Sequence, residues 1–96
     1  MSEKYILEGK KVVPCYDLYK WANWMKNADR KVASDKKGGI MVSTIFLGLD
    51  HNFGQGEPLL FETMVFGGEH DEDMDRYSTW EEAEEGHKCM CERVGL

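Results

Sequence analysis

The 96-residue chain lacks any long hydrophobic run. No apolar stretch approaches the roughly 20 residues that a helix needs to cross a bilayer. The N-terminal segment MSEKYILEGKK also lacks the apolar core of a secretory signal. These absences argue against a membrane partner and against export, so the sequence predicts a cytoplasmic protein.

Cysteine is scarce too, with three residues at Cys15, Cys89 and Cys91. An odd number of cysteines without a recognisable spacing is not a disulfide framework, and free thiols are typical of reducing compartments. The short length predicts a single domain over residues 1–96. A domain of this size buries only roughly 60 to 65% of the surface that its unfolded chain exposes, so self-association would stabilise it.

Positive charge is scarce in the second part of the chain. Residues 1–40 contain nine Lys and Arg against five Asp and Glu, whereas residues 41–96 contain three against thirteen. The acidic part would repel nucleic acid, and the lysines of the basic part are scattered rather than clustered with aromatic residues. The sequence therefore predicts no nucleic-acid partner.

The segment 40–67 is rich in β-branched and aromatic residues and organises the rest of the chain. Its two apolar runs, Ile40–Leu49 and Leu59–Phe66, are separated by nine residues dense in turn formers. This pattern predicts two antiparallel strands joined by a long loop. If the loop closes symmetrically, Phe46 pairs with Glu62, and Phe46 shares a sheet face with Met64 and Phe66.

One helix is predicted before these strands in the sequence and another after them. The first is capped by Asp17 and should run to about Ser34, followed by the linker Asp35–Gly39; its apolar stripe comprises Leu18, Trp21, Met25, Ala28 and Val32. The second begins with the capping box Ser78-Thr79-Trp80-Glu81 and ends at Gly95; its stripe comprises Trp80, Ala83, His87, Met90 and Val94.

A short hairpin is predicted before the first helix, where apolar residues 5–7 and 12–13 flank Glu8-Gly9-Lys10. The predicted order is β(β)αββα, which favours an α+β fold with a small antiparallel sheet of three to four strands and two helices on one face. The other face, with Phe46, Met64 and Phe66, would remain uncovered. This uncovered apolar face therefore predicts an interface and a homo-oligomer.

The long loop and Glu62 are the candidate ligand-binding residues. Asp50, His51, Asn52 and Phe53 combine an acid, an imidazole, an amide and an aromatic ring on one loop. The alternative is that Asp50 and Asn52 cap turns while Phe53 folds back onto the core. Glu62 is a candidate general base with His51, or a surface carboxylate that meets solvent or a partner's lysine.

Two metal patterns are incomplete. Asp71, Asp73, Asp75 and Glu82 imitate a calcium loop, but Arg76 occupies the position where the turn needs glycine. His87 and Cys91 are one helical turn apart, as in half of a soft-metal site. The other potential ligands, His51, His70 and Cys15, are dispersed, so the sequence predicts no metal site, no cofactor and no complete catalytic set.

Three segments of the chain resemble a family of small proteins encoded by tailed phages, prophages and bacteria: PCYDLYKWANWM, VSTIFLGLDHNFGQGEPLLFETMVFGG and RYSTWEEAEEGH. The family has no assigned activity. The resemblance implies a phage or mobile-element setting and, by analogy with other small phage proteins, action on a host component in host takeover or defence evasion.

Together these observations favour a non-enzymatic, oligomeric binding protein that engages a host protein or a small ligand through the loop and the uncovered sheet face. One alternative is a small enzyme with acid–base chemistry at His51 and Glu62, with or without a metal. Another is a structural or accessory phage component.

Overall fold

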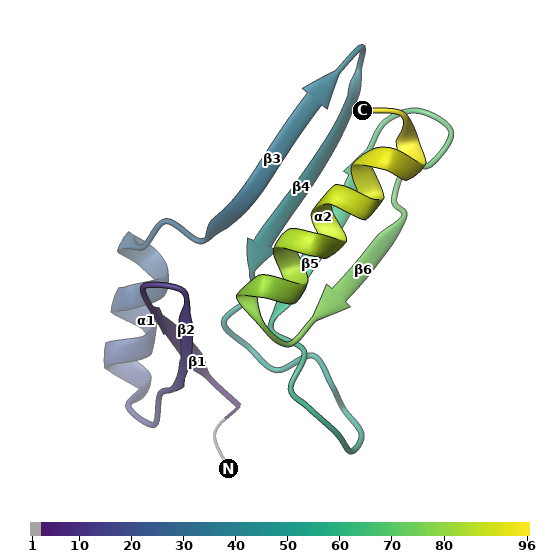
Figure 1. The fold of residues 1–96 in the computed structure, drawn as a ribbon. Coiled ribbons are helices and arrows are strands. Elements are labelled where there is room, and N and C mark those ends of the chain that lie inside the picture. Colours follow the sequence, from purple (N-terminus) through teal and green to yellow (C-terminus); the bar gives the residue numbers. More distant parts are fainter. Residues whose placement is uncertain (1–2) are drawn as a thin grey trace.

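The computed structural model describes residues 3–96, so Met1 and Ser2 of the predicted domain lie outside it. Figure 1 shows the element order ββαββββα: β1 (Tyr5–Glu8), β2 (Lys11–Pro14), α1 (Leu18–Asn27), β3 (Lys31–Lys37), β4 (Ile40–Phe46), β5 (Phe61–Phe66), β6 (Met74–Tyr77) and α2 (Trp80–Val94). The predicted α+β class is confirmed.

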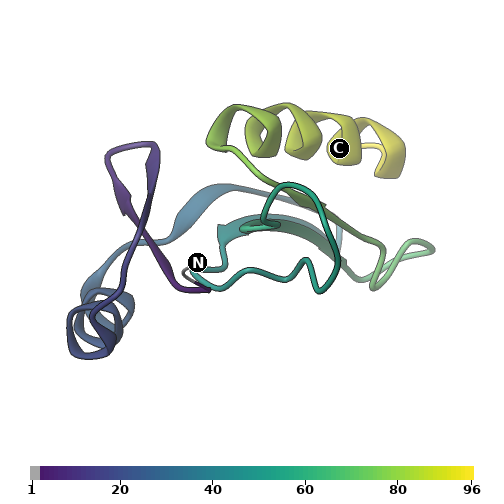
Figure 2. The same cartoon turned by 90° about the horizontal axis from the view of Figure 1, so that it is seen from below.

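Two antiparallel sheets build the fold. Strands β3, β4, β5 and β6 follow one another in a four-stranded sheet, and β1 and β2 form the predicted N-terminal hairpin. Figure 2 shows α2 along one side of the large sheet, while α1 lies beyond its end. α1 packs against β1, which differs from the expected placement of both helices on one sheet face.

The predicted first helix is too long. Asp17 caps α1 as expected, accepting from the backbone N–H groups of Tyr19 and Lys20, but α1 ends at Asn27. Residues 31–37 form β3 instead, and Gly38 and Gly39 turn the chain into β4 with φ angles of +55° and +84°. Two successive positive φ angles are typical of a tight hairpin turn, and β4 pairs with the backbone groups of β3 that face it.

The predicted register of β4 and β5 is wrong by one residue. Phe46 pairs with Phe61 and Thr44 with Thr63, because the loop closes through Leu47 N–H to Leu60 O and His51 N–H to Leu59 O rather than symmetrically. A slip of one residue moves a strand's side chains to the other face.

The corrected register changes the predicted interface. Phe46 is 0% exposed and lies in the core with Phe61 and Ala83 of α2, so its assignment to the uncovered face is wrong. Met64 and Phe66 alternate with the buried residues Thr63 and Val65 of β5, which places them on the face opposite α2.

The second helix follows its predicted stripe. Ala83, His87 and Met90 are buried against the sheet, and Gly95 ends α2 in the left-handed conformation. The capping box is formed by Thr79 and Glu82, one residue later than predicted. Gly86 packs closely on β6, because a Cβ there would overlap the ring of Tyr77.

The hairpin and α1 are attached to one end of the large sheet. The Trp24 ring contacts Phe46 edge-on at 5.7 Å, and the Trp21 indole N–H donates to the carbonyl of Gly48 at 3.1 Å. Within residues 3–96 there is no helix whose length and apolar character would suffice to cross a bilayer.

Candidate functional site

The face of the large sheet opposite α2 is the first candidate region, here called the open face. Strand alternation and register place on it Met41, Ser43 and Ile45 of β4, Glu62, Met64 and Phe66 of β5, and Met74 and Arg76 of β6. Phe66 and Met74 are both 44% exposed, and Met64 is half-buried. Ser34 and Lys36 of β3 lie opposite Ser43 and Met41 on the same face. The open face is thus an apolar row across β4, β5 and β6 with a polar edge at β3.

An ion pair interrupts the apolar surface. The Arg76 Nε–H donates to Glu62 Oε2 at 3.0 Å, and both side chains are largely shielded, with 31% and 15% exposed. The charge of Glu62 is therefore balanced within its own chain by the residue opposite it on β6. Because this carboxylate is paired, the apolar side chains of β4, β5 and β6 surround a neutral ion pair.

The loop between β4 and β5 is held by its own polar side chains. Asp50 Oδ1 accepts from the backbone N–H of Asn52 at 2.7 Å and of Leu59 at 3.0 Å, which joins the two ends of the loop. The Asn52 amide donates to the carbonyls of Gln55 and Glu57, at 3.3 and 2.9 Å. These bonds confirm the turn-capping interpretation of Asp50 and Asn52.

Phe53 does not fold back onto the core. Its side chain is 92% exposed, and its ring centre lies 6.4 Å from that of His51. Beside these rings is a cavity of about 510 Å³, lined by Glu3, Leu49, Asp50, His51, Asn52, Phe53 and Gly54. The loop therefore presents an aromatic ring and an adjoining hollow on a preformed backbone.

His51 and Glu62 have separate partners. The His51 ring is hydrogen-bonded through Nδ1 to the carbonyl of Leu49 at 2.9 Å, whereas Glu62 pairs with Arg76 on the open face. Within residues 3–96, the hydrogen bonds and ion pairs of these two side chains do not join them. The acid–base alternative requires that convergence, so this arrangement gives it no geometric support.

The four acidic residues with calcium-loop spacing, Asp71, Asp73, Asp75 and Glu82, have other structural roles. Asp71 accepts from the backbone N–H of Gly67 at 2.7 Å, and Asp73 pairs with His70 at 3.0 Å. Asp75 lies in β6, and Glu82 serves the capping box of α2. In the described part of the chain, these carboxylates do not converge as a group of metal ligands.

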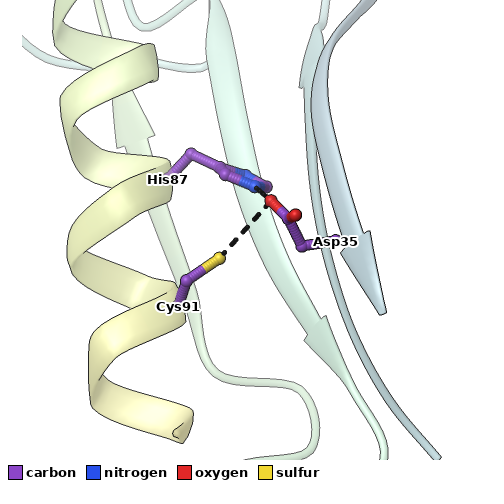
Figure 3. Close-up of side chains that lie close together, drawn as sticks. All are labelled: Asp35, His87 and Cys91. Carbon is purple, nitrogen blue, oxygen red and sulfur yellow. Dashed lines mark hydrogen bonds and ion pairs between the residues drawn. The ribbon is translucent and has the colours of Figure 1, made fainter. Parts of the chain in front are cut away.

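Three potential ligands do converge elsewhere, between β3 and α2. His87 Nε2 lies 2.7 Å from Asp35 Oδ2, and the Cys91 thiol donates to the same oxygen at 3.8 Å. The donor atoms of Asp35, His87 and Cys91 all lie within 4.8 Å of one another. Figure 3 shows the two side chains of α2 pointing toward Asp35 across the edge of the sheet.

The sequence indicated two of the three residues of this cluster. The spacing of His87 and Cys91 was a visible signal, but Asp35 fell in the predicted linker after an overlong helix. Because residues 31–37 form a strand paired with β4, Asp35 lies opposite Val42 on the face that α2 covers. Asp35, the third residue of the cluster, could be found only by recognising β3.

His87 is anchored from its other side. The side chain is 4% exposed, and Nδ1 is hydrogen-bonded to the hydroxyl of Thr44 at 2.7 Å. The Thr44 hydroxyl is bonded in turn to that of Thr63 at 2.5 Å, so a buried chain of hydroxyl groups fixes the ring. The ring is thereby oriented with Nε2 toward Asp35.

The outer side of the cluster opens to the surface. A cavity of about 300 Å³ is lined by Asp35, His87, Lys88, Cys91, Glu92 and Leu96. The Asp35 side chain is 60% exposed, and burial raises the pKa of the Cys91 thiol, as do the charge and hydrogen bond of Asp35. The thiol is therefore a hydrogen-bond donor at neutral pH rather than an activated nucleophile.

No protein-family model, curated protein or solved structure matches the chain.

Proposed function

We propose that the chain is a non-enzymatic binding protein that associates through the open face of its large sheet. The observation that carries this proposal is the uncovered apolar row of Met41, Ile45, Met64, Phe66 and Met74. A contiguous apolar surface of this kind on a small domain is typical of an interaction site. The partner proposed for the open face is a second copy of the chain, which would make the protein a homo-oligomer.

Sheet-to-sheet packing suits this surface. The described part of the molecule measures 42 × 30 × 19 Å, and across the large sheet it has a single helical layer, α2. Two copies facing each other would bury both open faces in a layer about 10 Å thick, as in β-sandwiches. The Glu62–Arg76 pair suits such burial because each charge already has its partner.

The loop supplies a second contact region. An aromatic ring held on a preformed loop loses little conformational entropy on binding, and aromatic residues dominate the energy of many interfaces. Phe53 therefore serves as the anchor for a partner protein, and the hollow beside His51 admits a small ligand. Hydrogen bonds of Asp50 and Asn52 hold the loop that carries Phe53 and lines this hollow.

The biological setting of this proposal comes from the sequence resemblance. A chain similar to small phage and prophage proteins would act in the host cytoplasm, on a host component, in takeover or defence evasion. The cytoplasmic location agrees with the free thiols of Cys89 and Cys91.

The oligomeric state tests the role of the open face. We expect sedimentation analysis of the wild-type protein to give more than one chain per particle, and Phe66→Asp to shift it to the monomer. The matched control is Tyr19→Asp, which places the same charge at an exposed aromatic residue of α1. A monomeric wild-type protein at high micromolar concentration, or an unchanged Phe66→Asp variant, would contradict the proposal.

The anchor is tested separately. Protein purified from infected cells should retain a host protein or a small molecule in native mass spectrometry, and Phe53→Ser should lose it while keeping its subunit count. Tyr19→Ser is the control. Equal retention by wild type and Phe53→Ser would assign the binding to another surface.

A further inference from the structure

We propose that Asp35, His87 and Cys91 bind a transition-metal ion of the zinc class. The site lies between β3 and α2, on the face of the sheet opposite the open face, and is independent of the proposed association. It offers one carboxylate oxygen, one imidazole nitrogen and one sulfur atom on three side chains.

The donor set selects the class of metal. Zinc and its neighbours take imidazole, thiolate and carboxylate ligands together, whereas calcium and magnesium require mainly oxygen ligands. A single carboxylate with a thiol and an imidazole is therefore a poor site for the hard cations. The thiolate form of Cys91 would be the ligand, so binding of the metal displaces the thiol proton.

The donor atoms already lie close to the separations that a metal requires. Tetrahedral zinc with ordinary bond lengths holds its nitrogen and oxygen ligands about 3.4 Å apart and places sulfur about 3.6 Å from either. Asp35 Oδ2 lies 2.7 Å from His87 Nε2 and 3.8 Å from Cys91 Sγ. His87 Nε2 and Cys91 Sγ lie within 4.8 Å of each other, so rotations of the exposed Asp35 carboxylate and of the Cys91 side chain would bring the three donors to these separations.

The hydrogen bond of the second ring nitrogen of His87 matches the one that a metal-bound histidine commonly makes. A metal-bound histidine commonly donates its other ring N–H to an oxygen acceptor, which fixes its orientation. Thr44 Oγ1 occupies that position at 2.7 Å from Nδ1, and Thr63 lies behind it. Because each hydroxyl can both donate and accept, the same chain serves His87 when Nε2 carries a hydrogen and when Nε2 binds a metal.

Three ligands leave one position of a tetrahedral ion open. The cavity bounded by Lys88, Glu92 and Leu96 adjoins the three donor atoms and gives room for a water molecule or a small anionic ligand. Such a vacant position is typical of metal sites that bind or activate a ligand rather than of closed structural sites.

Cobalt(II) is the probe for the test, because its visible spectrum reports tetrahedral geometry and its near-ultraviolet charge-transfer band reports thiolate ligation. We expect the untagged, reduced protein to bind one cobalt ion per chain with both signals, and zinc to displace it. Cys91→Ala should lose the charge-transfer band, and Asp35→Asn and His87→Gln should weaken binding at least tenfold.

Matched variants separate ligation from structure. Cys89→Ala removes an exposed thiol two residues from Cys91 and should bind cobalt like the wild type. Thr44→Val should weaken binding roughly 10 to 100-fold while leaving the charge-transfer band in place at saturation, as expected for a residue that positions a ligand. Circular dichroism of each variant checks that it is folded.

Two outcomes would overturn the proposal. In the first, cobalt fails to bind at one equivalent per folded chain, and the cluster serves only as a hydrogen-bonded tether between β3 and α2. In the second, the thiolate band survives Cys91→Ala and disappears in Cys89→Ala or Cys15→Ala, so the metal binds at another cysteine.

Discussion

Gly86 is the residue at which local preference and packing oppose each other. Alanine is favoured over glycine inside a helix by about 1 kcal/mol, yet a Cβ at this position would overlap the ring of Tyr77. Overpacking of this kind typically costs about 1 to 3 kcal/mol. We therefore expect Gly86→Ala to lower the free energy of unfolding in urea denaturation, whereas Glu85→Ala on the exposed side of α2 should change it little.

A double-mutant cycle identifies the cause of that loss. In a Tyr77→Leu background the obstructing ring is absent, so adding Gly86→Ala should become neutral or stabilising. If Gly86→Ala is equally harmful in both backgrounds, contact with Tyr77 is not the reason for glycine at this position.

We also expect Tyr77 to make the free energy of unfolding depend on pH in the alkaline range. Burial raises the pKa of Tyr77 above its ordinary value near 10, and the charge of Asp75 adds to the effect. A raised folded-state pKa means that the neutral phenol contributes stability below about pH 10, and this contribution is lost as pH rises through the folded pKa. The free energy of unfolding of Tyr77→Phe, measured from pH 8 to 11, should fall less steeply than that of the wild type.

The exposed Tyr19 provides the comparison for this pH series. Tyr19→Phe removes a phenol that is 86% exposed and should leave the alkaline slope as in the wild type. Parallel slopes for wild type and Tyr77→Phe would show that the Tyr77 phenol does not set the alkaline limit.

At the scale of elements, the predictable parts are those with a local signal. Asp17, the capping box and Gly95 mark helix ends through their own backbone bonds, and α2 differs from its prediction by one residue. Within residues 31–37, β3 has no such signal, because its stability comes from pairing with β4. Val32 continued the period of α1 by coincidence, and the glycine pair at 38–39 was the overlooked sign of a hairpin.

In the candidate site too, residues governed by a local pattern were predictable, whereas residues placed by contacts distant in sequence were not. Met64 and Phe66 were placed on the same face as each other because both lie in one strand, where alternation alone decides; that this face lies opposite α2 is set by the packing of α2. Phe46 was misplaced because its face relative to β5 depends on how the loop closes, and that depends on Asp50 and Leu59. Asp35 was missed because it meets His87 only in three dimensions, 52 positions apart in the sequence.

Asp50 is expected to control the order of the whole loop. Its carboxylate accepts from the backbone N–H groups of Asn52 and Leu59, and alanine would leave both without that acceptor. We expect Asp50→Ala to speed hydrogen exchange at the Leu59 amide and proteolysis within residues 52–57, with Asp50→Asn intermediate. Glu57→Ala alters an exposed side chain of the same loop and should change neither rate; equal rates in Asp50→Ala and wild type would contradict this assignment.

At the scale of the molecule, the two faces of the sheet differ in what they bury. The α2 face encloses Phe46, Phe61 and Val65, each 0% exposed, together with the buried hydroxyl groups that hold His87. The open face has no such cover among residues 3–96. Under the proposed association, a second copy would cover the apolar surface and add to the stability of this thin core.

Association should therefore appear in the melting temperature. Because pairing of open faces stabilises the folded state and not the unfolded chain, the Tm should rise with protein concentration. Phe66→Asp, expected to be monomeric, should melt at a lower Tm that is independent of concentration, whereas Tyr19→Asp should keep the concentration dependence. A wild-type Tm that stays constant over a hundredfold range of concentration would mean that the folded chain is stable alone and that its open face is not a self-association surface.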